Sequence, residues 1–178
     1  MKKFMFLSVI ICVSVFFLSF KPVSEAGGIK WMNWKQMQEA QKVEKRKVFV
    51  DVYTGWCGWC KRMDATTFVD ATVSKYANEK FYAVKFDAET RDNIVFNGKT
   101  YKYVSQGYRG YNELAADILN GQMSYPTTVF IDEDLKLLFP VPGFIEPEKF
   151  HTVLNYVGSN SYQKMSWDKF DAEFNPEN

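Results

Sequence analysis

The sequence is poor in the residues that build metal sites and has no excess of charge of one sign. It holds three cysteines and one histidine, His151, among 178 residues, whereas a structural zinc site takes four such ligands. Its 22 basic and 21 acidic side chains are spread along the chain, which argues against nucleic-acid binding. Internal repeats and low-complexity segments are also missing. The length and the 47% of hydrophobic residues suffice for one domain with a substantial core.

Long hydrophobic runs are also scarce, and the one exception lies at the N-terminus. Residues 4–20 carry no charge and follow two lysines, while Ser24 and Ala26 are the small residues that a signal peptidase reads. Residues 1–26 are therefore predicted to be a secretory signal peptide that is cleaved before Gly27, with the periplasm as the expected location. The alternative is an uncleaved signal that anchors the chain in the inner membrane, because the run has the minimum length of a membrane span.

Once the signal and its Cys12 are removed, two cysteines remain, Cys57 and Cys60 in the stretch YTGWCGWCK. A Cu(I) site that also uses Met63 is one alternative, although the shortage of histidine counts against it. A structural disulfide at this spacing closes too short a loop to restrict the unfolded chain much. In an exported protein the pair is most simply a dithiol/disulfide switch, and no metal or organic cofactor is expected.

Hydrophobic periodicity predicts alternating helices and strands over residues 27–160. The predicted helices cover 31–46, 58–78 with a break near Thr66 and Asp70 as a second cap, 112–120 and 146–160. The predicted strands cover 47–54, 81–89, 125–132 and 137–143, the last at a sheet edge because it contains Pro140. A βαβ unit followed by α-β-β-α predicts an α/β fold with a mixed central sheet and helices on both faces.

Two segments do not fit this alternation. Residues 90–111 are predicted to be an insert with a β-hairpin at Asn97-Gly98, followed by a loop over SQGYRGY. The four tyrosines of this insert are expected to pack the hairpin, with a partner-binding surface as the alternative. The tail, residues 161–178, is predicted to form a short helix that packs Trp167, Phe170 and Phe174.

The position of the cysteine pair suits redox chemistry. Cys57 falls after a predicted strand, where a helix begins, and the unpaired N–H groups of a helix start stabilise a thiolate. This lowers the pKa of a cysteine from about 8.5 toward neutral or below. Cys57 is expected to be the exposed thiol that attacks a substrate disulfide, and Cys60, one turn later and partly covered, to resolve the mixed disulfide. Trp56 and Trp59 are expected to form a partly exposed rim around Cys57.

The sequence resembles the thioredoxin family over most of residues 27–160. WCGWCK, residues 56–61, is similar to the family's WCxxCK active site, with Trp59 where thioredoxin has proline. Closer still are exported bacterial members whose helix reads CxWCKxMDxxTF, here CGWCKRMDATTF. Some of these are the soluble electron-passing domains of membrane thiol–disulfide interchange systems. The insert at 90–111 is absent from minimal thioredoxin, so the resemblance implies that it shapes the choice of partner.

The resemblance also implies roles for residues outside the motif. Asp51 matches the family's buried aspartate, which exchanges protons with the resolving cysteine, and Lys85 matches its neighbouring lysine. Tyr125-Pro126 matches the cis-proline loop, which pairs with the substrate backbone, and Gly143 matches the glycine after the last strand. The catalytic set is therefore expected to be Cys57, Cys60, Asp51 and Lys85. The substrate-binding set is expected to be Trp56, Gly58, Trp59, Tyr125, Pro126 and Gly143.

These features predict an exported thiol–disulfide oxidoreductase that acts mainly as a reductase. Its expected partners are protein thiols and disulfides and a membrane protein that donates electrons, because an exported compartment supplies no reductant of its own. Nucleic acid is not an expected partner, and contact with the membrane is expected only through an uncleaved signal. Two alternatives differ in mechanism. A binding module with the same fold keeps its function when both cysteines are replaced by serine, and a copper-handling module binds Cu(I) stoichiometrically.

Overall fold

The structure is a computed structural model that describes residues 27–175, and the predicted signal peptide lies outside that range. A five-stranded sheet forms the centre, in the order β1-β3-β2-β8-β9. Its strands are β1 (Trp31–Met32), β2 (Lys47–Tyr53), β3 (Phe81–Asp87), β8 (Thr127–Ile131) and β9 (Leu137–Pro142). β1, β3 and β2 run parallel, whereas β8 and β9 are antiparallel to their neighbours. The predicted mixed sheet is confirmed, and Pro140 does lie on an edge strand.

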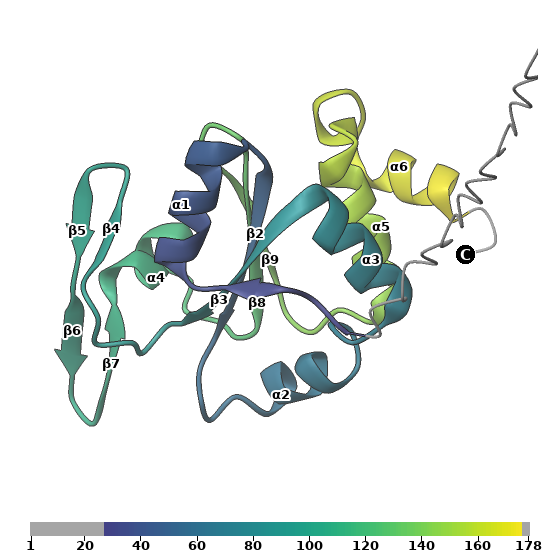
Figure 1. The fold of residues 1–178 in the computed structure, drawn as a ribbon. Coiled ribbons are helices and arrows are strands. Elements are labelled where there is room, and N and C mark those ends of the chain that lie inside the picture. The colour runs from purple at the N-terminus through teal and green to yellow at the C-terminus, as the bar shows by residue number, and fades with distance from the viewer. Residues whose placement is uncertain (1–26, 176–178) are drawn as a thin grey trace, which may run out of the picture.

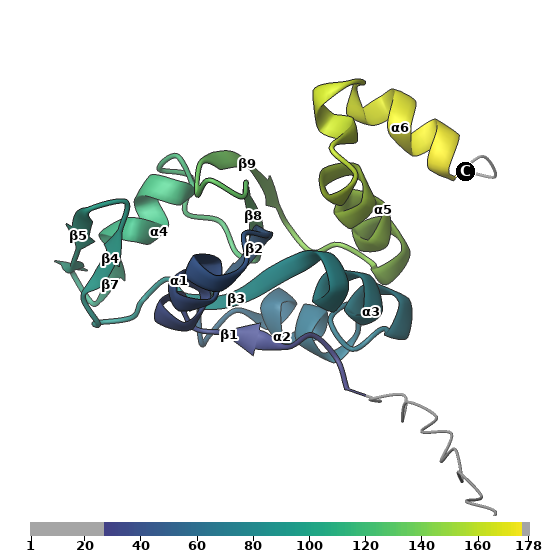
Figure 2. The same cartoon turned by 45° about the horizontal axis from the view of Figure 1, so that its top comes forward.

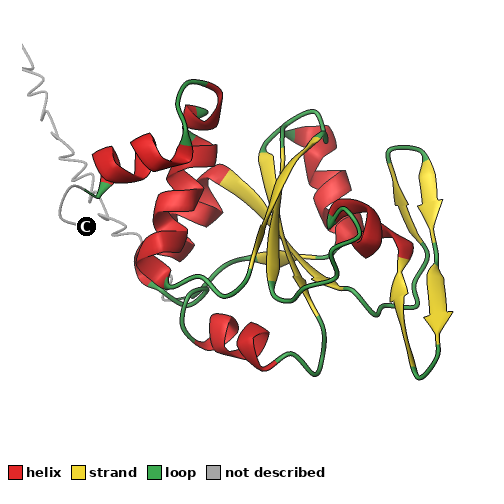
Figure 3. Ribbon diagram, turned by 180° about the vertical axis from the view of Figure 1, so that it is seen from behind, coloured by secondary structure: helices red, strands yellow, loops and turns green. Residues whose placement is uncertain are grey.

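Helices cover both faces of this sheet, as Figure 1 and the view from behind in Figure 3 show. α1 (Trp34–Val43) and α4 (Glu113–Ile118) pack on one face, and α2 (Gly58–Ala65), α3 (Ala71–Lys80) and α5 (Pro147–Gly158) pack on the other. Alternation along β2 explains the two layers, because Val48, Val50 and Val52 enter the first core and Phe49 enters the second. Asp51 shares the Phe49 side of the strand and therefore faces the α2 layer.

The start of the domain differs from the sequence prediction. The prediction of a helix over 31–46 was wrong at its N-terminus. Trp31 and Met32 instead form the edge strand β1, which pairs with Ala83 and Val84. Asn33 then caps α1, and its side chain and that of Gln36 form a reciprocal capping box. The apolar face that suggested a longer helix is shared between a sheet edge and a helix.

The predicted break in the helix over 58–78 is confirmed. α2 ends at Ala65, and Asp70 caps α3 by accepting hydrogen bonds from the backbone N–H groups of Thr72 and Val73. This kink lets α2 lie below the sheet in Figure 1 while α3 packs beside α5. The active-site helix is therefore short and separate from the long helix of the second layer.

The insert contains two hairpins rather than one hairpin and a loop. β4 (Ile94–Phe96) and β5 (Lys99–Tyr101) turn at Asn97-Gly98 as predicted, and both turn residues have positive φ. The predicted loop was wrong, because β6 (Tyr103–Gln106) pairs with β7 (Arg109–Asn112) around a turn at Gly107. This second hairpin was missed because its strands are short and polar and lack the alternation that marks a strand.

The tail continues from α5 through a 3-10 turn, Ser161–Gln163, into α6 (Trp167–Phe174). Rings of α6 pack against Tyr156 of α5, with centroids 5.4 Å away for Trp167 and 5.1 Å away for Phe170. Figure 2 shows this helical pair at the end of the domain that is remote from the two hairpins. The tail therefore extends the second helical layer. Within residues 27–175, no helix has the length and apolar character needed to cross a membrane.

Candidate active site

The two cysteines lie at the junction between the end of β2 and the start of α2. A turn follows β2, in which the backbone N–H of Cys57 donates to the carbonyl of Thr54 over 3.1 Å. Cys57 is the N-cap of α2, and its Sγ accepts a hydrogen bond of 3.1 Å from the backbone N–H of Cys60. The two residues are joined by a disulfide, with their Cα atoms 5.3 Å apart. The predicted strand-to-helix setting is confirmed.

The predicted exposure of Cys57 is wrong for this disulfide form. Cys57 is 4% exposed and Cys60 is 2% exposed, so neither residue is open to solvent. The reason is that Cys57 Sγ is directed toward α2, where it is bonded to Cys60 Sγ and accepts a hydrogen bond from the backbone N–H of Cys60. The exposed neighbours are instead Trp56 and Trp59, at 51% and 56%, which confirms that the tryptophans form a partly exposed rim.

An ion cluster of one buried and two partly exposed side chains lies on the α2 side of the sheet. Asp51 is 1% exposed, and its Oδ2 accepts a hydrogen bond of 2.5 Å from Lys85 Nζ on the neighbouring strand β3. The register pairs Asp51 with Lys85, which sets both side chains on the same face. Lys85 Nζ also binds Asp64 of α2, so one cation is shared between two carboxylates. Asp51 and Lys85, predicted from the resemblance, do lie together.

The protonation of Asp51 follows from its burial. Removal from water raises the pKa of Asp51 from 3.8 to about 6, although the nearby Lys85 ammonium acts in the opposite direction. Its second oxygen, Oδ1, has no hydrogen-bond partner among the described residues. Asp51 can therefore release and take up a proton at mildly acidic pH, which suits a group that exchanges protons with a thiol.

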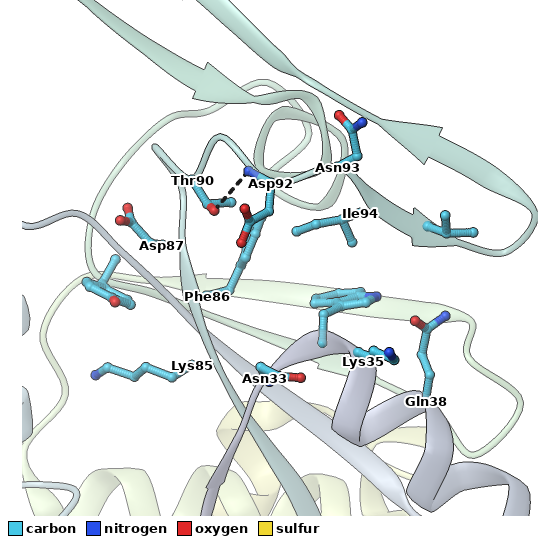
Figure 4. Close-up of a pocket in the computed structure, with 13 residues that line it drawn as sticks. Asn33, Lys35, Gln38, Lys85, Phe86, Asp87, Thr90, Asp92, Asn93 and Ile94 are labelled. Atoms are coloured by element: carbon cyan, nitrogen blue, oxygen red, sulfur yellow. Dashed lines mark hydrogen bonds between the residues drawn. The ribbon is translucent and has the colours of Figure 1, made fainter.

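Lys85 also lines a pocket with both polar and apolar side chains. This cavity of about 490 Å³ opens between the start of α1, the end of β3 and the start of the insert (Figure 4). Lys85 and Asp87 line it together with Asn33 and Asp92. Asp51 is therefore enclosed, whereas its partner Lys85 is partly exposed and lines this pocket.

The predicted substrate loop is also in place. The Tyr125–Pro126 peptide bond is cis and directly precedes β8, and the carbonyl of Pro126 accepts a hydrogen bond of 2.8 Å from the backbone N–H of Gly143. Gly143 has φ +94°, a conformation that suits glycine. The ring of Tyr125 meets the Trp56 ring edge-on at 5.9 Å, which places this loop beside the cysteine motif. Burial raises the pKa of Tyr125 to about 12, so its hydroxyl stays neutral.

The rim contains residues that sequence analysis did not single out. Trp56 Nε1 donates to Glu89 Oε1 over 3.0 Å, and the guanidinium of Arg109 lies 4.4 Å from the centre of the Trp56 ring. On the other side, Phe144 packs against Trp59 with centroids 5.4 Å apart. Asp64 of the ion cluster was not singled out either, although its position one helical turn after Cys60 could have indicated it. Nothing in the sequence near Arg109 indicated its contact with Trp56, because that contact depends on how the insert folds back.

The remaining predicted residues have simpler settings. Gly58 opens α2 in open space, so no close contact requires a glycine there. His151 lies on α5, where its ring packs against Tyr76 and Phe174. No three histidine, cysteine, aspartate or glutamate side chains gather as a metal-binding group within residues 27–175.

Comparisons with known proteins agree with this arrangement. Residues 34–158 match the family model described as a thioredoxin-like domain. A curated relative, the uncharacterized protein B0495.5 of Caenorhabditis elegans, is 27% identical over 139 residues. That match covers 72% of this chain but only 17% of the relative's length.

Solved structures share the fold at low sequence identity. The DsbH oxidoreductase has a TM-score of 0.55 and 16% identity, with 80% of this chain and 92% of that chain covered. A thioredoxin-fold protein from Helicobacter pylori has a TM-score of 0.53 and 21% identity, with 70% and 76% covered. A proposed disulphide-isomerase from Bacteroides thetaiotaomicron has a TM-score of 0.51 and 27% identity, with 74% and 93% covered.

Proposed function

The chain belongs to the thioredoxin-like domain family, and we propose that it is an exported thiol–disulfide oxidoreductase that reduces protein disulfides through Cys57 and Cys60. The observation that carries the proposal is the disulfide between these cysteines at the start of α2, beside a cis-proline loop. The family match and the structural similarity to oxidoreductases support thiol–disulfide exchange in general. We further propose that electrons flow from this protein to its substrates and that the protein is exported.

The proposed reaction begins with the reduced pair. The Cys57 thiolate attacks one sulfur of a substrate disulfide, forms a mixed disulfide and expels the other substrate sulfur as a thiolate, which takes up a proton. Cys60 then loses its proton to Asp51 and attacks Cys57 Sγ. The Cys57–Cys60 disulfide forms, and the second substrate sulfur leaves as a thiolate, which takes up a proton from Asp51 or from solvent. Two electrons have passed to the substrate, and the protein has reached the disulfide form that the structure describes.

The other residues support these steps. The helix start is proposed to stabilise the Cys57 thiolate, because the backbone N–H of Cys60 in the first turn of α2 donates to Cys57 Sγ. Lys85 binds Asp51 and is itself bound by Asp64, and its partial exposure is proposed to give the proton a route to solvent. Tyr125, Pro126 and Gly143 are proposed to hold the substrate backbone, and Trp56, Gly58 and Trp59 to contact it around the disulfide. The cysteine pair is the redox group, and we propose no further cofactor.

Export and the electron donor complete the proposal. The apolar run at residues 4–20 supports export, to the periplasm in a bacterial envelope. A reductase there must be recharged, so we propose a membrane protein as the donor of electrons.

The reduction potential of the pair is the measurement that tests the direction. The chain that starts at Gly27, in which Cys57 and Cys60 are the only cysteines, is equilibrated with dithiothreitol or glutathione buffers. We expect a value near that of thioredoxin, about −270 mV, as a reductase requires. A value near −120 mV would reverse the proposed direction and make the protein an oxidant. A pair that forms no reversible disulfide would rule out oxidoreductase function altogether.

A further inference from the structure

The second hairpin of the insert reaches the active-site rim. Figure 1 shows the β6–β7 turn and the loop that enters α2 on the same lower side of the molecule, whereas the β4–β5 turn points the opposite way. Arg109, the first residue of β7, stacks its guanidinium on the ring of Trp56, the residue before Cys57. Trp56 is held from its other sides by Glu89 and Tyr125. The insert thus adds a cation on Trp56, the residue that precedes Cys57.

Charge is also divided unevenly between the insert and the rest of the domain. Residues 90–111 contain four basic side chains and one acidic side chain, whereas the rest of 27–178 contains 15 basic and 19 acidic ones. Lys99 lies 3.6 Å from Asp117. The exposed Arg91, Lys102 and Arg109 form no ion pair with any carboxylate of residues 27–175. The insert therefore carries local positive charge on a domain that is otherwise acidic.

The arginine on the opposite side of the cysteine motif, Arg62, differs from Arg109 in having an ionic partner. Arg62 lies near Trp59 and has Glu146 as an ionic partner at 3.8 Å. Within residues 27–175, Arg109 contacts the ring of Trp56 and no carboxylate, and the nearby Glu89 carboxylate accepts a hydrogen bond from the Trp56 indole instead. The stacking fixes the position of the guanidinium while its charge and its donors stay available.

We propose that Arg109, supported by the basic insert, binds an acidic segment of the protein whose disulfide exchanges with Cys57–Cys60. This inference rests on the proposed function, because it names the chemistry of the partner at the same site. Complementary charge accelerates encounter and fixes register, and it acts over a distance of about 8–10 Å at physiological salt. Arg109 lies within that distance of the residue that precedes Cys57, so an acidic segment next to the substrate disulfide can reach it.

The test compares two disulfide peptides that differ only in charge. One has glutamates beside its disulfide, and the other has glutamines at the same positions. The full chain with Cys12→Ser is held in mild detergent and reduced, and its rate constant with each peptide is measured at low and high salt. We expect the acidic peptide to react faster at low salt and to lose this advantage at high salt. Arg109→Gln should slow the acidic peptide roughly three- to tenfold more than it slows the neutral peptide.

Three controls separate charge from structural damage. Arg109→Lys keeps the charge and should keep most of the preference for the acidic peptide. Lys75→Gln removes the same charge from the exposed surface of α3 and should change neither rate. The reduction potential of Arg109→Gln should equal that of the parent protein. Equal rates for the two peptides, or an equal loss on both in Arg109→Gln, would overturn the proposal. A protein that reduces neither peptide would instead contradict the proposed function.

Discussion

Replacing Cys57 with serine is expected to lower the rate of disulfide exchange by roughly a thousandfold or more, to the uncatalysed background. A serine hydroxyl is not ionised near neutral pH, so the helix start that stabilises a thiolate has no anion to stabilise. Cys60→Ser is expected to behave differently. Its Cys57 can still attack, but no second thiol resolves the product, and the variant should accumulate a covalent mixed disulfide with the substrate. Reduction of a disulfide protein, followed by non-reducing electrophoresis, measures both outcomes.

Cys12→Ser is the matched control, because it removes a cysteine of the predicted signal peptide and should leave the rate unchanged. The same variants distinguish the proposed enzyme from a binding module with this fold. If a protein in which both Cys57 and Cys60 are serine still performs its cellular role, the cysteines are incidental and the binding module is the better description.

Replacing Asp51 with asparagine is expected to stabilise the folded protein at neutral pH by about 3 kcal/mol, since a rise from 3.8 to about 6 spans roughly two pKa units of about 1.4 kcal/mol each. Between these values the folded protein keeps a proton that the unfolded chain has lost, so stability falls as pH rises through this window. The asparagine variant carries no such charge. The loss of Asp51 also leaves Lys85 with Asp64 as a partner.

Urea unfolding of the disulfide form at several pH values measures this effect. The advantage of Asp51→Asn should be full above about pH 7 and should disappear below about pH 3.5, where both states of the parent are protonated. Asp92→Asn makes the same chemical change at an exposed position and should alter stability little. The exchange rate of Asp51→Asn should fall roughly tenfold or more, because Cys60 loses its proton acceptor. An advantage that is the same at every pH would show that the buried charge is not its cause.

Much of the fold could be predicted because local pattern and tertiary structure agree. The apolar strands predicted at 47–54 and 125–132, the break before Asp70 and the turn at Asn97-Gly98 each carry a strong local signal, and the structure bears them out. The two errors, at β1 and at β6–β7, concern short strands. A two-residue edge strand and a polar hairpin are stabilised by what they pair with, so their own sequences give little indication of them.

Periodicity and spacing, which act within a few residues, were enough to predict the mixed α/β sheet and the place of the cysteine pair at a helix start. The family resemblance added Asp51, Lys85 and Pro126. How these groups meet depends on the packing of the folded domain. Lys85 is shared with Asp64 because α2 folds back under the sheet, both cysteines are buried in the disulfide form, and Arg109 reaches Trp56 from an insert 53 residues further along the chain. Such contacts depend on packing between distant segments, which no local pattern encodes.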